Sequence, residues 1–168
     1  MSSQVLTEQT LSLEQSALTA WVRLLRTHAA LKRDFNARLQ FEHGLTVNDY
    51  EALLLLSHES DQRLKRVVLA ERLQLTPSGV TRLLDGLEAA GFVEKGSCES
   101  DARITYAVLT GSGSEKLKEA SCSHVAAVRE LFGERFGDDE LRTLGELLGR
   151  LPGGATDSAE CAVGPTAA

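Results

Sequence analysis

Four polar side chains stand three or four residues apart between residues 78 and 85, namely Ser78, Thr81, Arg82 and Asp85. At that spacing they share one face of a helix. The hydroxyl groups can donate and accept hydrogen bonds, the guanidinium only donates, and the carboxylate only accepts. The small residues allow close approach to a surface, and a helix N-terminus attracts phosphate. These residues therefore indicate binding of a polar, phosphate-bearing partner.

Asp101 and Arg103 form a second pair, with one residue between them. The guanidinium group is always charged, and its planar fork suits a narrow, negatively charged groove. A carboxylate two residues before it can hold that fork through a charge-assisted hydrogen bond. The alternative is a surface ion pair in a turn, which contributes only ~0–1 kcal/mol to stability.

Two short helices, at about 65–73 and 77–90, surround the first group of residues. Thr76 is a good N-cap for the second helix, and Pro77 occupies a position where its missing N–H costs nothing. Gly91 ends this helix. Its inward face is expected to carry the apolar residues Val80, Leu83, Leu84 and Leu87.

Two strands are predicted after these helices, one within "GFVEK" (91–95) and one within "ITYAVLT" (104–110), because both are rich in β-branched and aromatic residues. A helix-turn-helix followed by a hairpin is a winged helix. Its second helix fits the major groove of DNA, with the N-terminal residues nearest the bases. A plain helical hairpin in an all-α core would explain the leucines but not the strands.

A long helix is predicted over 12–42, beginning near Ser12 and ending at Gly44, because its apolar residues recur every three or four positions. At about 45 Å it exceeds a small domain, so its apolar stripe is expected to contact a second chain. Thr46 and Asp49 resemble a capping box at the start of the next helix. The other helices are expected at 46–60, from just after "GSGSEK" (111–116) to about Gly133, and from 138 to just before 152.

The chain has 168 residues and a net charge of −6, which argues weakly against nucleic-acid binding. The charge is unevenly distributed, however. Residues 61–110 hold seven basic and seven acidic side chains, whereas both flanks are acidic. Any surface that faces phosphate is therefore expected within 61–110.

No apolar run approaches the ~18 residues of a membrane span, and the N-terminus lacks the pattern of a secretory signal. Cys98, Cys122 and Cys161 show neither paired nor metal-type spacing. We therefore expect a cytoplasmic protein with reduced thiols, no membrane partner and no metal. Oxidation of Cys98 could still alter DNA contact, and a zinc sensor built from the four histidines is a remote alternative.

The chain resembles the multiple-antibiotic-resistance regulator (MarR) family of transcription factors. The resemblance rests on "LAERLQLTPSGVTRLLDGLEAAGFVEK" (69–95), on the pair Asp101 and Arg103, and on "VLT" before a helix. It implies a mainly α fold with a small β-wing, in which a winged helix-turn-helix is embedded in an α-helical dimerisation domain. Members bind pseudo-palindromic double-stranded DNA as homodimers, and many release it when a small, often aromatic, ligand binds.

The implied organisation places a helical dimerisation region at 12–45 and 111–151, a DNA-binding region at 46–110, and flexible tails at 1–11 and 152–168. By this resemblance Arg103 enters the minor groove and Asp101 holds it. The full set of expected DNA-binding residues is Thr76, Ser78, Gly79, Thr81, Arg82, Lys95, Asp101 and Arg103. A ligand pocket is expected at Trp21, Leu25, His28, Tyr50 and Leu54, although such residues are more often core.

The chain departs from the family pattern, because members commonly carry basic residues where it has Gly86, Ala90 and Gly96. Fewer phosphate contacts predict weaker non-specific DNA binding and a shallower salt dependence. Asp85 would repel phosphate unless it accepts a hydrogen bond from a cytosine amino group. Arg63, Lys65, Arg66 and Arg72 are candidates for additional backbone contacts, or for a solvated polar face.

Two other functions were weighed against a DNA-binding repressor. No catalytic or cofactor-binding motif occurs, so we expect neither an enzyme nor a cofactor. The low basic content keeps a second alternative open, a winged-helix module that binds protein without contacting DNA.

Overall fold

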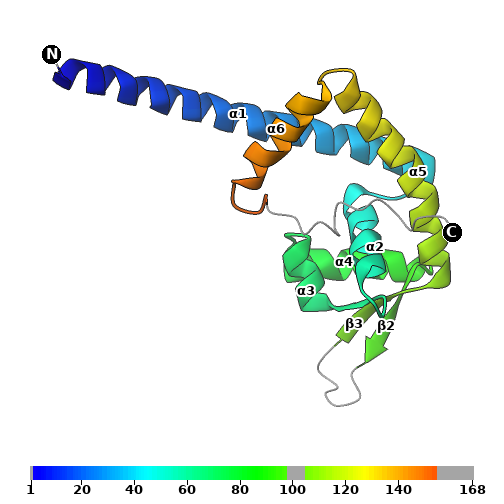
Figure 1. Cartoon of the computed structure of the whole chain (residues 1–168). Helices are drawn as coiled ribbons and strands as arrows, with labels where there is room; N and C mark the ends of the chain where they lie inside the picture. The colour runs from blue at the N-terminus through cyan, green and yellow to red at the C-terminus, as the bar shows by residue number, and fades with distance from the viewer. Residues whose placement is uncertain (1, 98–104, 155–168) are drawn as a thin grey trace. The chain divides into compact units, whose positions relative to one another are not determined.

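A computed structural model describes residues 2–97 and 105–154 of the chain, with side chains from residue 14 onward. The architecture is mainly α with a small antiparallel sheet, which confirms the expected fold class (Figure 1). The elements are α1 (Ser2–His43), α2 (Val47–His58), β1 (Arg63–Lys65), α3 (Arg66–Arg72), α4 (Pro77–Ala89), β2 (Val93–Ser97), β3 (Thr105–Leu109), α5 (Gly111–Gly133) and α6 (Asp138–Gly149).

The chain divides into two units, one ending at Arg38 and the other beginning at Leu39. The first unit is the N-terminal part of α1, and its apolar residues Leu18, Trp21 and Leu25 are exposed. All other elements belong to the second unit. The expected division into a dimerisation region and a DNA-binding region concerns function rather than contacts within the chain, and it stays a prediction.

Helix α1 begins at Ser2, so the predicted start near Ser12 is wrong, and residues 2–11 are helical rather than a tail. Neither glycine nor proline occurs in this stretch, and serine lowers helix propensity only slightly, so nothing ends the helix there. Gly44, at φ +70°, follows the last helical residue as predicted. The C-terminal tail from residue 155 lies outside the described residues.

The sheet has the strand order β1-β3-β2, and both pairings are antiparallel. The predicted hairpin is confirmed, but β1 was missed because it has only three residues. Leu64 pairs with Ala107, and Val93 pairs with Leu109. All four side chains are buried, so one face of the sheet covers the core.

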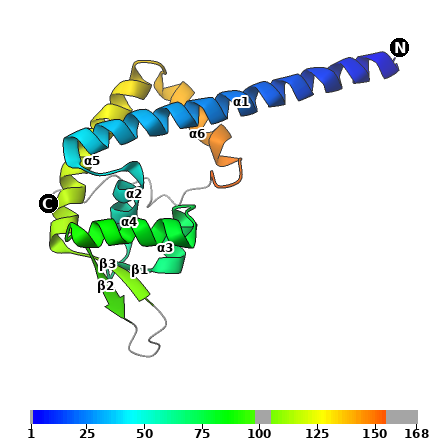
Figure 2. The same ribbon diagram turned by 180° about the vertical axis from the view of Figure 1, so that it is seen from behind.

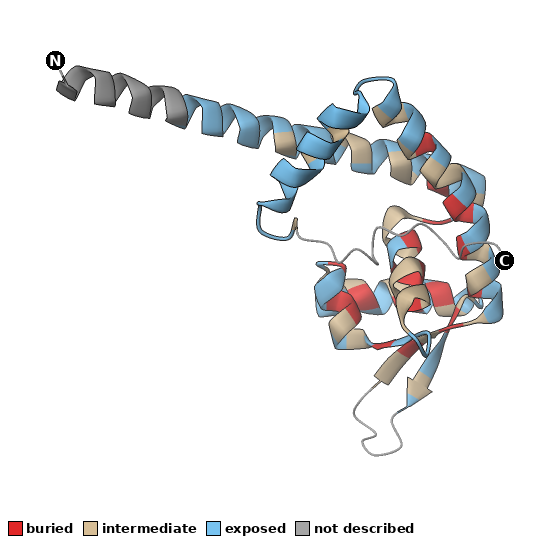
Figure 3. Cartoon of the chain, viewed as in Figure 1, coloured by how far each residue is buried: buried red, intermediate tan, exposed pale blue. Residues whose placement is uncertain are grey.

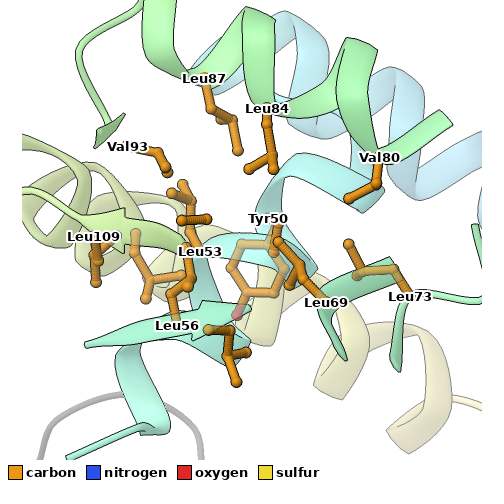
Figure 4. Packing of buried hydrophobic residues seen from close by; sticks show 14 of the residues in the cluster. Tyr50, Leu53, Leu56, Leu69, Leu73, Val80, Leu84, Leu87, Val93 and Leu109 are labelled. Carbon is orange, nitrogen blue, oxygen red and sulfur yellow. The ribbon is translucent and has the colours of Figure 1, made fainter. Parts of the chain in front are cut away.

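The core of the second unit is formed mainly by side chains from α2, α3, α4, α5 and the sheet (Figure 3). Leu53, Leu56, Leu69 and Leu84 are fully buried in it. Figure 4 shows Leu84 and Leu87 of α4 directed into this cluster. The predicted capping box of α2 is also present, because Thr46 Oγ1 accepts from the Asp49 N–H and the Thr46 N–H donates to the Asp49 carboxylate. The capping box and the burial of Leu53 and Leu56 therefore both stabilise α2 in this position.

Candidate nucleic-acid interface

The turn between α3 and α4 is held by hydrogen bonds at both helix ends. After α3, the N–H groups of Gln74 and Leu75 donate to the carbonyl groups of Glu71 and Ala70, at 3.1 and 2.9 Å. Gln74 adopts φ +53° there. Thr76 caps α4, since its Oγ1 accepts from the Gly79 N–H at 3.1 Å. This turn and cap bring α3 and α4 together as a helix-turn-helix.

Helix α4 has one buried and one exposed face. Val80, Leu84 and Leu87 are buried in the core. The predicted polar residues Ser78, Thr81, Arg82 and Asp85 are all exposed. The helix therefore presents the expected polar face while its leucines fix its position on α2 and the sheet.

Two side chains on the exposed face hydrogen-bond to their own helix. Thr81 Oγ1 donates to the carbonyl oxygen of Pro77 at 2.8 Å, and Arg82 Nε donates to that of Ser78 at 3.4 Å. The side chain of Asp85 has no hydrogen-bond or ion-pair partner within residues 2–97 and 105–154. In the same part of the chain, Arg82 has no acidic partner. The face thus offers one unpaired cation and one unpaired anion.

Lys95, which is predicted to contact DNA, forms an ion pair in this structure. It lies on β2 opposite the buried Ala107, and its Nζ is 2.9 Å from the carboxylate of Glu88 on α4. The other predicted wing residues, Asp101 and Arg103, lie outside the described residues, as does Cys98. The pair of Lys95 and Glu88 therefore joins the described part of the wing to α4.

Other cations of this region are also matched by acids. Arg63 is 2.6 Å from Asp61 and lies over the ring of Tyr106, and Arg72 is 2.8 Å from Glu59. The positive charge of the winged helix is thus partly neutralised within its own surface. Arg72 and Lys95 pair with acids that lie outside their own elements, so spacing in the sequence does not predict these two pairs.

A groove of about 350 Å³, which the sequence pattern does not predict, lies between α3 and α4. Val67, at its edge, is 69% exposed. The Nη2 atom of Arg66 is buried without a hydrogen-bond partner among the described residues. The groove is lined by Arg66, Val67, Ala70, Glu71, Leu75, Pro77, Val80 and Thr81.

The residues of the expected ligand pocket belong to different units. Trp21, Leu25 and His28 are exposed on the N-terminal unit. In the second unit Tyr50 is buried, and its hydroxyl lies 3.2 Å from Ser121 Oγ, while Leu54 packs partly against the core. Tyr50 is thus a core residue whose polar tip is satisfied. The ligand pocket stays a prediction.

Two further properties concern the described residues only. No group of three or more histidine, cysteine, aspartate or glutamate residues among them could hold a metal ion. None of the helices they form is long and apolar enough to cross a membrane.

Comparison with known proteins adds to this geometry. Residues 43–104 match the sequence model of the MarR family. The HTH-type transcriptional repressor YetL of Bacillus subtilis is 33% identical over 111 residues, which cover 64% of this chain and 66% of YetL, just under two thirds of that relative.

Two solved structures from Streptomyces coelicolor are similar over most of their length. AbsC, a MarR family transcriptional regulator, is 33% identical with a TM-score of 0.71, over 78% of this chain and 88% of AbsC. Sco3205, a MarR family regulator solved in complex with DNA, is 26% identical with a TM-score of 0.75, over 88% of this chain and 92% of Sco3205. The similarity therefore extends well beyond the helix-turn-helix.

Proposed function

Since the chain belongs to the MarR family of winged-helix transcriptional regulators, we propose that it acts as a homodimeric repressor on a pseudo-palindromic DNA operator. The family regulates transcription and is not a family of enzymes, so this chain is a DNA-binding regulator. Repression is proposed because YetL is a transcriptional repressor, and the DNA complex of Sco3205 supports direct DNA contact. The two-fold arrangement and the residues that contact DNA are parts of the proposal.

The polar face of α4 carries the proposal most directly. It is exposed along its length while the opposite face is fixed in the core, as a helix that enters the major groove requires. In this scheme Ser78, Thr81 and Arg82 bind base edges and nearby phosphates. Thr76 and Gly79 form the start of the helix that faces the phosphate backbone. Asp101 and Arg103 are proposed to read the minor groove from the wing.

Exposed apolar side chains support a second copy as partner. Trp21 on α1 is 57% exposed, and Leu147 and Leu151 near the C-terminal end of α6 are 50% and 46% exposed. Large apolar groups left in water favour association. A two-fold dimer would place its half-sites about one helical turn, or ~10 base pairs, apart. Release of DNA by a small aromatic ligand remains a prediction from the family resemblance.

The proposal is tested by DNA selection followed by titration. Genomic fragments retained by the purified protein are sequenced, and fluorescence anisotropy then compares the wild type with Arg82→Ala. We expect a loss of at least roughly tenfold in affinity, because the guanidinium contacts bases or phosphate. Arg142→Ala on α6 is the control, since it removes the same charge from an exposed site of another element.

The same experiment decides between DNA binding and a protein-only module. The pairing of Arg63, Arg72 and Lys95 with acids is the observation that keeps the second function in view. A module that binds only protein would retain no specific DNA fragments, and Arg82→Ala would leave capture of its protein partner unchanged.

A further inference from the structure

The exit of α4 is a tight turn that places two carbonyl groups next to the start of α5. Gly91 adopts φ +76°, and the N–H groups of Gly91 and Phe92 donate to the carbonyl groups of Glu88 and Leu87, at 3.0 and 2.9 Å. This is the Schellman pattern that ends a helix. The carbonyl groups of Gly91 and Phe92 themselves remain free for other partners. Both views show this end of α4 beside the beginning of α5 (Figure 1 and Figure 2).

The first turn of α5 supplies the partners of both carbonyl groups. The hydroxyl groups of Thr110 and Ser112 each donate to the Gly91 carbonyl oxygen at 2.7 Å. A carbonyl oxygen has two lone pairs, so both are used. The N–H of Thr110 donates to the Phe92 carbonyl oxygen at 3.1 Å. Three hydrogen bonds therefore connect segments about twenty residues apart in sequence.

Gly113 brings the two segments still closer. A Cβ atom at this position would lie 2.1 Å from the Phe92 carbonyl oxygen and 2.9 Å from Leu109 Cδ1. Any side chain at 113 would therefore push α5 away from the exit of α4. Gly111 lies in the same turn, yet a Cβ there would meet nothing within 4 Å. The need for glycine at 113 thus comes from its contact with Phe92.

These contacts hold the exit of α4 and the start of α5 in a fixed position relative to each other. Helix α5 has 23 residues, so it extends about 35 Å from this junction. We propose that the contacts of Thr110, Ser112 and Gly113 with Gly91 and Phe92 set the position of α4 relative to α5. This position would in turn determine the spacing between the two DNA half-sites that the protein prefers. The inference rests on the proposed function, because only a dimer with two α4 helices has a spacing to select.

The test uses the full chain and the half-site found by genomic selection. Duplexes carry two half-sites whose centres are separated by about 8 to about 12 base pairs, and the affinity for each is measured by anisotropy. The variants are Gly113→Ala and Ser112→Ala. Their controls are Gly111→Ala and Ser114→Ala, which change the same turn without touching the exit of α4. Sedimentation shows whether each variant remains a dimer.

We expect the wild type and both controls to prefer one spacing. In Gly113→Ala and Ser112→Ala, preference for that spacing over its neighbours falls about fivefold, the equivalent of one net hydrogen bond. Should Gly113→Ala fail to fold, Ser112→Ala decides. A purely structural role would weaken binding at every spacing by the same factor, and that result, or an unchanged preference, would overturn the inference. A wild type that binds no duplex with two half-sites would overturn the proposed function, and the inference with it.

Discussion

The ammonium group of Lys95 on β2 lies 2.9 Å from the carboxylate of Glu88 on α4. The side chain of Lys95 is 56% exposed and that of Glu88 is 19% exposed, so the pair lies at the edge of the molecule rather than in its core. Exposed pairs of this kind contribute little to stability. The pair is important here because Lys95, a cation in the described part of the wing, is already neutralised by Glu88.

Lys95→Ala is expected to change DNA affinity by less than about fivefold, in line with the ~0–1 kcal/mol of an exposed pair. Arg82 has no acidic partner among the described residues, so Arg82→Ala should lower DNA affinity at least roughly tenfold. In a Glu88→Gln background the effect of Lys95→Ala should grow, because the freed ammonium can neutralise a phosphate. A double-mutant cycle by anisotropy measures this coupling. Equal losses for Lys95→Ala in both backgrounds would contradict the account.

The salt dependence of DNA binding should be shallow. Arg63, Arg72 and Lys95 are paired with acids, and Gly86 and Gly96 contribute no charge to α4 and β2. We therefore expect a slope of log K against log salt that corresponds to fewer than about ten phosphates per dimer. Anisotropy titrations over a series of chloride concentrations give the slope. A value for ten or more phosphates would show that these ion pairs open on DNA.

Alanine substitutions of two glycines, one within α4 and one just after it, should change stability in opposite directions. Gly91→Ala places a Cβ at φ +76° and should lower the free energy of unfolding by ~1 kcal/mol. Gly86 lies exposed within α4, where a Cβ would meet nothing within 4 Å, so Gly86→Ala should raise it by ~0.5–1 kcal/mol. Urea unfolding followed by circular dichroism measures both. Destabilisation by Gly86→Ala would contradict the regular helix seen there.

Trp21→Ser is expected to raise the dimer dissociation constant at least roughly tenfold, because large aromatic side chains dominate interface energies. Trp21 is 57% exposed and shares a helix face with Leu18 and Leu25. Thr27→Ala lies on the opposite face of α1 and serves as the control. Analytical ultracentrifugation gives the dissociation constants. Identical values for the two variants would place the interface elsewhere.

Features that depend on neighbours in sequence were predictable. The capping box of Thr46 and Asp49, the cap at Thr76 and the helix stops at Gly44 and Gly91 each involve residues within a few positions of one another. The division of α4 into a buried and an exposed face also follows from a local period of 3.6 residues. The candidate DNA-binding face of α4 could therefore be predicted from the sequence alone.

Features that depend on tertiary packing were not predictable. Strand β1 has three residues and exists because Leu64 pairs with Ala107, more than forty positions later. The partner of Lys95 and the closeness of Gly113 to Phe92 likewise arise only when separate elements meet. The sequence thus indicated which residues face outward, but not which of their charges are already matched.

The hydrogen bonds from Thr81 to the Pro77 carbonyl and from Arg82 to the Ser78 carbonyl have a thermodynamic consequence. Each hydrogen bond favours one rotamer of its side chain in the free protein, so ordering that side chain on a ligand loses less entropy. The outer face of α4 is in this sense preorganised. Its discrimination among sequences would then appear mainly in how slowly the correct complex dissociates, rather than in how quickly it forms.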